Sequence, residues 1–158
     1  MDEPRWLSAN ERETWLALAG VLIKLPFALD AQLQADADLS HFEYQVLAGL
    51  SESPDRSLRM SKLAILANGS LSRLSHVVAR LEKRGWVRRT SDPDDGRYTL
   101  AVLTDAGWDK VVATAPGHVA AVRKHVFDAL TASQVRQLGE IGARIIATTD
   151  PNCGPLGP

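Results

Sequence analysis

One short segment of the chain gathers side chains that could read the edges of base pairs. It offers three serine hydroxyls, a guanidinium and an imidazole, on Ser70, Ser72, Arg73, Ser75 and His76. An arginine can form two hydrogen bonds with one guanine, and serine can bond to any base. His76 is equally well explained as an exposed helix residue without a base contact. The segment is therefore a candidate for contacting bases in double-stranded DNA.

The charges of the chain are distributed unevenly along it. The chain carries 18 Lys plus Arg and 19 Asp plus Glu, for a formal net charge of −1. Residues 56–91, here called the basic block, hold nine basic groups and one acidic group. Residues 1–55 hold three basic and ten acidic groups, and residues 92–158 hold six and eight. The basic block indicates a polyanion-binding surface, although a solvated helix face has the same composition.

Length and composition exclude several classes of protein. With 158 residues, 45% of them apolar, and a single cysteine, Cys153, the chain is neither disordered as a whole nor a disulfide scaffold. Its longest charge-free apolar stretch, residues 14–23, is cut by Lys24 and Pro26, short of the ~20 residues that span a bilayer. The N-terminus is acidic and shows no signal peptide. We expect a cytoplasmic protein with no membrane partner.

A long helix is expected to begin at Ser8, where Ser8 and Glu11 fit a capping box. Its apolar residues step by three or four and occupy two neighbouring faces, at Trp15, Leu16, Leu18, Leu22, Ile23, Leu25, Phe27, Leu29 and Leu33. A helix that is apolar on two faces must bury both of them. Pro26 should kink this helix or break it.

Three shorter helices are expected in the middle of the chain. One starts at Ser40 with another capping box, and a second covers about residues 61–67. The third runs over residues 70–84 and stops at Gly85. Its apolar stripe is expected to comprise Leu71, Leu74, Val77, Val78 and Leu81.

Two strands and two further helices complete the expected elements. Residues 86–90 and 98–103 read as the strands of a hairpin with a long charged tip. A long helix should follow the cap at Thr104, with Pro116 starting or kinking its second half, and a last helix should follow Thr131. The predicted fold is therefore mainly α with a small β-hairpin wing.

The order helix, helix, turn, helix, hairpin is that of a winged helix-turn-helix. In that motif the second helix of the turn pair enters the major groove and the hairpin lies beside it. The predicted helix over residues 70–84 would be this recognition helix. Arg80 and its basic neighbours at the far end of this helix either neutralise phosphates or remain solvated.

Three stretches of the sequence resemble the MarR family of bacterial transcription regulators. They are LRMSKLA at residues 58–64, SRLSHVVARLEKRGWVRR at residues 72–89, and DGRYTLAVLTDAG at residues 95–107. The resemblance extends over roughly residues 6–148 and is nearest to the actinobacterial type of the family. LEKRG alone would be a weak signal, whereas all three stretches in order and at the right separation are specific.

The resemblance implies a homodimer that reads a pseudo-palindromic operator, most often as a repressor released by a ligand. It implies dimerisation helices at residues 1–39 and 105–149, a DNA-binding region at residues 40–104 and a flexible tail at residues 150–158. The first helix, which is apolar on two faces, independently favours a dimer, although its stripes could instead fold back onto the same chain.

The resemblance also assigns roles at the tip of the wing. Arg97 matches the wing arginine that family members insert into the minor groove, and Asp95 matches the acidic residue that orients it. A narrow minor groove has an enhanced negative potential, which suits an arginine. Asp92, Asp94 and Asp95 would repel phosphates, so at least two of them must point elsewhere.

Family members often bind small aromatic or anionic effectors between the dimerisation helices and the winged domain. Trp15, His41 and Tyr44 are candidates for lining such a cleft, and each is also explained as a core or interface residue. The four histidines show no metal-binding spacing, so we expect neither a metal nor a cofactor. No catalytic motif is present, and we do not expect an enzyme. The remaining alternative is a winged helix that binds another protein without reading DNA.

Overall fold

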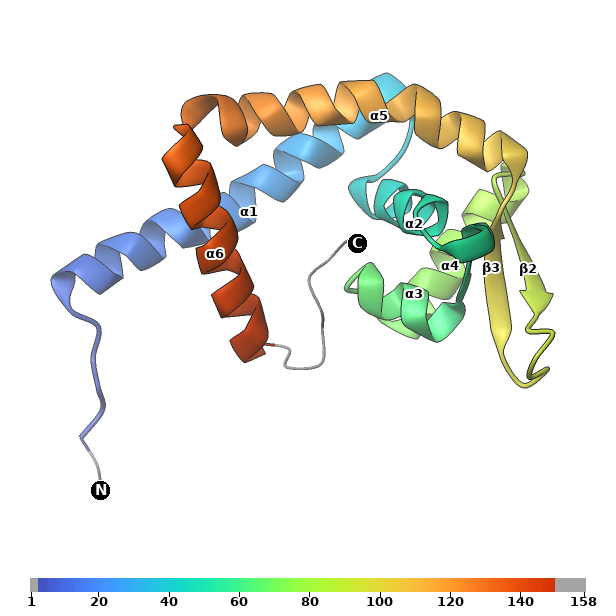
Figure 1. Ribbon diagram of the computed structural model, residues 1–158, viewed down its shortest axis with the longest axis horizontal. Coiled ribbons are helices and arrows are strands. Elements are labelled where there is room, and N and C mark those ends of the chain that lie inside the picture. Colours follow the sequence, from blue (N-terminus) through green and yellow to red (C-terminus); the bar gives the residue numbers. More distant parts are fainter. Residues whose placement is uncertain (1–2, 150–158) are drawn as a thin grey trace.

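The computed structural model describes residues 3–149 and shows a winged domain below an arch of long helices (Figure 1). In chain order the elements are α1 (Ala9–Ala37), α2 (His41–Ser51), η1 (Pro54–Arg56), β1 (Ser57–Arg59), α3 (Met60–Leu66), α4 (Leu71–Lys83), β2 (Val87–Ser91), β3 (Thr99–Leu103), α5 (Asp105–His125), η2 (Phe127–Ala129) and α6 (Ala132–Thr149). α1 and α5 pack side by side in the arch, and α6 descends from the far end of α5. The predicted tail, residues 150–158, lies outside the described part of the chain.

The predicted helix starts are confirmed by their caps. Both Ser8 and Ser40 accept a hydrogen bond from the backbone N–H three residues on, and a glutamate carboxylate accepts from each serine's own N–H. Ser70 caps α4 and Thr104 caps α5 through their hydroxyl groups. These local hydrogen bonds explain why the sequence alone locates where the helices begin.

A three-stranded antiparallel sheet forms the wing and its base. The strand order is β1-β3-β2, with Leu58 opposite Ala101 on one side of β3 and Arg89 opposite the same residue on the other. The sequence predicted β2 and β3 but not β1, because three residues are too few to show an alternating pattern. Gly85 joins α4 to the sheet at a φ of +75°, a conformation that glycine adopts without strain.

The core of the winged domain is made of side chains from α1–α5 and the sheet. The largest of its fully buried side chains are Leu33, Leu39, Leu47, Leu50, Leu63, Leu74 and Leu81. Gly107 packs at the start of α5, where an added Cβ would collide with the Trp86 carbonyl oxygen and lie 2.7 Å from Leu103 Cδ1. The wing base is therefore fixed tightly to the first turn of α5.

The predicted apolar stripe of α4 is wrong in including Leu71. Its side chain is 55% exposed and lies outside the core, whereas Leu74, Val77, Val78 and Leu81 are buried. The spacing of three residues places Leu71 near the buried face, but the first turn of α4 extends beyond the packed core. The stripe that holds α4 in place therefore begins at Leu74.

Neither Pro26 nor Pro116 ends its helix. α1 continues through Pro26 for 29 residues, and α5 continues through Pro116 for 21 residues. Both prolines lie on exposed faces, where the helix can adjust around the missing N–H. Of the predicted alternatives, a break at Pro26 and a helix starting at Pro116 are therefore excluded, and a kink at each proline stays a prediction.

Much of the apolar surface of the arch is uncovered in the single chain. The exposed apolar side chains include Trp15, Leu16, Val21, Leu22, Ile23 and Phe27 on α1 and Leu138, Ile141 and Ile145 on α6. Because α1 is continuous, an 18-residue window of it reaches a mean hydropathy of 1.6 and is long and apolar enough to cross a membrane. The sequence alone excluded a membrane-spanning segment, and by this criterion of length and composition that exclusion does not hold for α1. A second protein chain packed against this face would remove the same apolar side chains from water equally well.

Candidate nucleic-acid interface

α4 presents a polar face on the side opposite its buried stripe. Its cap is formed by the Ser70 hydroxyl, which accepts a hydrogen bond from the Arg73 backbone N–H at 3.1 Å. Ser70, Ser72, Arg73 and His76 are exposed, and Ser75 is half-buried. The first two turns of the helix therefore hold the predicted base-reading side chains where a duplex could approach.

Two hollows flank α4, and together they bring most of the predicted DNA-binding residues onto one surface. The first, of about 540 Å³, lies between α4 and the start of α2 and is lined by Ser40, Phe42, Ser70, Ser72, Arg73, His76, Val77 and Arg80. The second, of about 310 Å³, is here called the wing-side hollow and is lined by Arg59, Met60, Ser61, Leu71, Ser75, Arg89, Arg97, Tyr98 and Thr99. Only Asp95 of the predicted set lines neither hollow.

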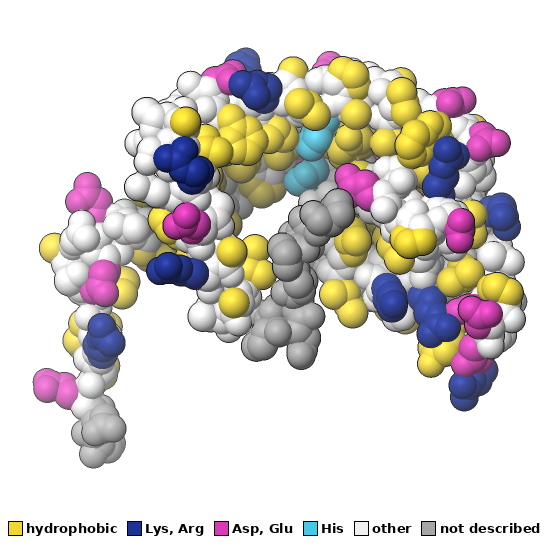
Figure 2. All heavy atoms as spheres, in the orientation of Figure 1, with side chains coloured by type: hydrophobic (Ala, Val, Ile, Leu, Met, Phe, Trp, Pro, Cys, Tyr) yellow, Lys and Arg dark blue, Asp and Glu magenta, His cyan; other side chains and the backbone are white. Residues whose placement is uncertain are grey.

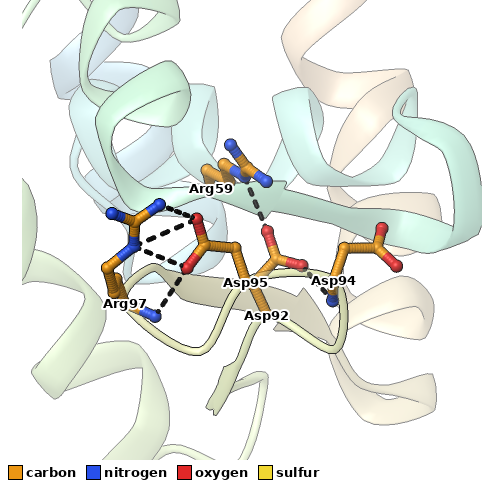
Figure 3. A network of polar contacts seen from close by, with 5 residues as sticks. All are labelled: Arg59, Asp92, Asp94, Asp95 and Arg97. Atoms are coloured by element: carbon orange, nitrogen blue, oxygen red, sulfur yellow. Dashed lines mark hydrogen bonds and ion pairs between the residues drawn. The ribbon is translucent and has the colours of Figure 1, made fainter.

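Arg97 is held at the tip of the wing by Asp95. Its Nη2 donates to Asp95 Oδ2 at 2.6 Å, and its Nε donates to Oδ1 at 2.9 Å (Figure 3). The side chain of Arg97 is nevertheless 84% exposed, against 26% for Asp95. The hydrogen bonds from Arg97 lower the pKa of Asp95, and Asp95 in turn raises the pKa of Arg97. The pair remains charged, and the two hydrogen bonds to Asp95 leave the Arg97 guanidinium facing solvent.

Asp92 turns inward to a different arginine, Arg59, as Figure 3 shows. Its carboxylate is 6% exposed and accepts from the backbone N–H of Asp94 at 2.9 Å and from Arg59 Nε at 2.6 Å. These two contacts, the N–H of Asp94 first, lower the pKa of Asp92. The Arg59 guanidinium also lies 4.2 Å from the centre of the Tyr98 ring. The negative charges of Asp92 and Asp95 are thus both paired, and Arg59 ties the tip loop to the start of α3.

Five members of the basic block form ion pairs, so its net charge overstates its positive surface. Arg56 pairs with Asp105, Arg59 with Asp92, Arg80 with Glu43, Arg84 with Asp38 and Arg89 with Glu82. Four of these carboxylates come from the acidic segments on either side of the block. Within residues 3–149, Lys62, Arg73, Lys83 and Arg88 form no ion pair, and Figure 2 shows blue and magenta side chains intermixed near the wing.

Two arginines of α4 are held against α2. Arg80 Nε donates to Glu43 Oε1 at 3.1 Å, and the Arg73 guanidinium lies 4.2 Å from the centre of the Phe42 ring. The Glu43 side chain is 10% exposed; burial alone would raise its pKa, but the Ser40 N–H and Arg80 lower it overall. Arg80 itself is 57% exposed, so it keeps a solvent-facing side.

Comparison with known proteins identifies the family of this fold. The model of the MarR family matches residues 39–99. A crystal structure of Sco3205, a MarR family transcriptional regulator from Streptomyces coelicolor in complex with DNA, is 49% identical, with a TM-score of 0.90 over 99% of this chain and 98% of that one. The chain belongs to the MarR family.

Further relatives agree with this membership. The structure of AbsC, another MarR family regulator from S. coelicolor, is 35% identical, with a TM-score of 0.88 over 94% of this chain and all of AbsC. The uncharacterised regulator YdcH of Bacillus subtilis is 32% identical over 84 residues, which cover 52% of this chain and 57% of YdcH. Membership in the MarR family places the chain among transcriptional regulators and not among enzymes.

In this MarR family chain, His41 and Tyr44 lie together with His118 of α5, which the sequence did not single out. The His118 ring is centred 4.6 Å from Tyr44 and 6.0 Å from His41. Burial lowers the pKa of both histidines, and His41 further lowers the pKa of His118. Trp15 does not join this cluster. His41 follows the C-terminal end of α1 closely in the chain, whereas Trp15 lies about 30 Å from that end along the helix.

Two buried polar atoms near this cluster have no hydrogen-bond partner in the described part of the MarR chain. They are His118 Nδ1 and Gln32 Oε1. No group of three or more metal-binding side chains occurs within residues 3–149. His118 and Gln32 gave no signal in the sequence, because α1 and α5 are brought together only by the fold.

Proposed function

We propose that this chain is a cytoplasmic, homodimeric repressor that reads a pseudo-palindromic operator through α4 and the wing of each protomer. The observation that carries the proposal is the exposed Arg97, fixed by Asp95 on the same surface as the exposed polar side chains of α4. An arginine that is already oriented loses less conformational freedom when it enters a groove. The winged region, residues 40–104, would provide both contacts.

α4 is proposed to enter the major groove with its N-terminal turns. Ser70, Ser72, Arg73, Ser75 and His76 would face base edges or the adjacent phosphates. Arg73 would leave the Phe42 ring to reach a guanine, at the cost of one cation–π contact. Arg80 would keep its ion pair with Glu43 and offer its exposed side to a phosphate.

Dimerisation is proposed to occur through residues 1–39 and 105–149. An apolar groove of about 900 Å³ runs between α1, the end of α5 and α6, with Leu16, Val21, Leu25, Leu138 and Ile141 among its lining residues. Its apolar faces are too large to remain in water and suit a self-complementary interface. Two protomers joined there would present two copies of α4.

A small aromatic or anionic effector is proposed to bind near His41, Tyr44 and His118, with Trp15 kept as a more distant candidate. The unpartnered His118 Nδ1 and Gln32 Oε1 support this, because buried polar atoms normally have hydrogen-bond partners that a ligand could supply. The cluster joins α2 of the winged region to α5 of the arch. A ligand there could change how the two α4 helices are spaced.

Two measurements test the proposal: the affinity for duplex DNA and the mass of the protein in solution. Anisotropy titrations of a labelled random duplex should show affinity that falls steeply with salt, by a slope of about −0.9 per phosphate neutralised. Light scattering should give a mass twice the 17.2 kDa of one chain. The alternative, a winged helix that binds only proteins, predicts no DNA binding at any salt concentration. A monomer, or no binding to any duplex, would contradict the proposal.

A further inference from the structure

Leu71 is an exposed apolar side chain at the start of the recognition helix. It is the first residue of α4, directly after the Ser70 cap, and its side chain is 55% exposed. The residues that follow it on the exposed face are serine, arginine and histidine. Leucine at this position adds nothing to the core, which on this helix begins at Leu74.

The surroundings of Leu71 combine apolar and basic side chains. In the wing-side hollow it lies with Met60 of α3 and with Tyr98, which precedes β3. Arg59, Arg89 and Arg97 line the same hollow, and its volume is about 310 Å³. Each of the three arginines is paired with a carboxylate, but Arg97 keeps 84% of its side chain exposed and can still meet a phosphate. The apolar side chains beside it can contact an apolar group carried by the same polyanion.

Double-stranded DNA carries one such group in its major groove. The C5 methyl of thymine is the apolar feature that distinguishes this base from cytosine there, and apolar side chains are its usual contacts. The N-terminal residues of a recognition helix are those that reach base edges. Leu71 is the first residue of α4, and Ser75 of the next turn lines the same hollow and could bond to a neighbouring base.

We infer that Leu71 determines specificity by packing against the methyl group of one thymine in each operator half-site. This inference rests on the proposed function, because it requires α4 to enter the major groove. Removal of one buried methyl group should weaken binding by about fourfold. A symmetric operator has two half-sites, so the combined loss should be about fifteenfold.

The test replaces thymine by deoxyuridine, which lacks only the methyl group. An operator is first obtained by selecting bound sequences from a random duplex pool. Each thymine is then replaced symmetrically in both half-sites, and affinity is measured at fixed salt. Wild type should lose about fifteenfold at one thymine pair, whereas L71A should bind the thymine operator more weakly and lose nothing further at that pair.

A matched control comes from α3. Ile65 is 64% exposed and does not line the wing-side hollow, so I65A should keep the full sensitivity to deoxyuridine. Circular dichroism should show L71A folded, because its side chain is outside the core. The inference is overturned if wild type tolerates every replacement or if L71A stays as sensitive as wild type. Failure of the pool to yield any bound duplex would instead refute the proposed function itself.

Discussion

Glu43 links the start of α2 to α4, and its removal should destabilise the winged domain. Its Oε2 accepts from the Ser40 N–H at 2.8 Å, and its Oε1 accepts from Arg80 Nε at 3.1 Å. Glu43→Ala keeps the bond to the Ser40 hydroxyl and loses the bond from the Ser40 N–H, which costs about 1 kcal/mol. Loss of the arginine contact adds about 1 kcal/mol at most, because Arg80 is 57% exposed and screened by water.

The free energy of unfolding of Glu43→Ala should therefore fall by about 2 kcal/mol. For a chain of this size each kcal/mol shifts Tm by about 2–4 °C, so thermal unfolding followed by circular dichroism should show a decrease of about 4–8 °C. Glu43→Gln keeps an acceptor for the Ser40 N–H and loses only the charge. Its Tm should fall by about half as much.

A matched control exists at the start of α1. Glu11 completes the same capping box with Ser8, at the same 2.8 Å, but it is exposed and pairs with no arginine in the described part of the chain. Glu11→Ala should therefore lower Tm by less than Glu43→Ala. Equal shifts for the two variants would refute the reasoning, because burial and Arg80 would then contribute nothing.

The pH dependence of Glu43 provides a second check. Its pKa is lowered in the folded state, so its stabilising contribution is fully present above the unfolded value of about 4.3 and is lost as the pH falls through the folded value. The difference in stability between wild type and Glu43→Gln should be constant between about pH 5 and 8. It should shrink below about pH 4.

Three further outcomes are expected. Arg97→Ala should weaken operator binding by roughly ten- to a hundredfold at fixed salt with an unchanged Tm, and unchanged affinity would contradict its role in the wing. Gly107→Ala should destabilise the protein by about 1–3 kcal/mol in urea unfolding, whereas Gly139→Ala, with nothing within 4 Å, should not. The pKa of His118 is lowered, so the unfolded chain takes up its proton first and stability falls as pH drops below about 6.5. His118→Asn should reduce this loss between pH 8 and 5.5, and an equal loss in both proteins would contradict it.

The elements that local chemistry defines could be predicted from the sequence. Ser8, Ser40 and Thr104 cap their helices through bonds to residues three positions away, so the signals lie within a single turn. Gly85 ends α4 as predicted, since its positive φ is a local property. The order of these elements was sufficient to predict a winged helix.

Features that depend on distant residues could not be predicted. Arg59 and Asp92 are 33 positions apart, and Arg84 and Asp38 are 46 positions apart, so no spacing rule links them. Such pairs reduce the positive charge that a count along residues 56–91 indicates. The exposure of Leu71 could not be predicted for a similar reason. The spacing of apolar residues shows which face of α4 is buried but not where along the helix the core ends.

The most direct test of the central claim is selection of bound sequences from a random duplex pool with the full chain. A dimer that presents two copies of α4 should enrich a two-fold symmetric site, with half-sites about one helical turn, roughly 10 base pairs, apart. Such a site would support the dimer, the role of α4 and sequence-specific reading together. An asymmetric site, or no enrichment at all, would contradict the account.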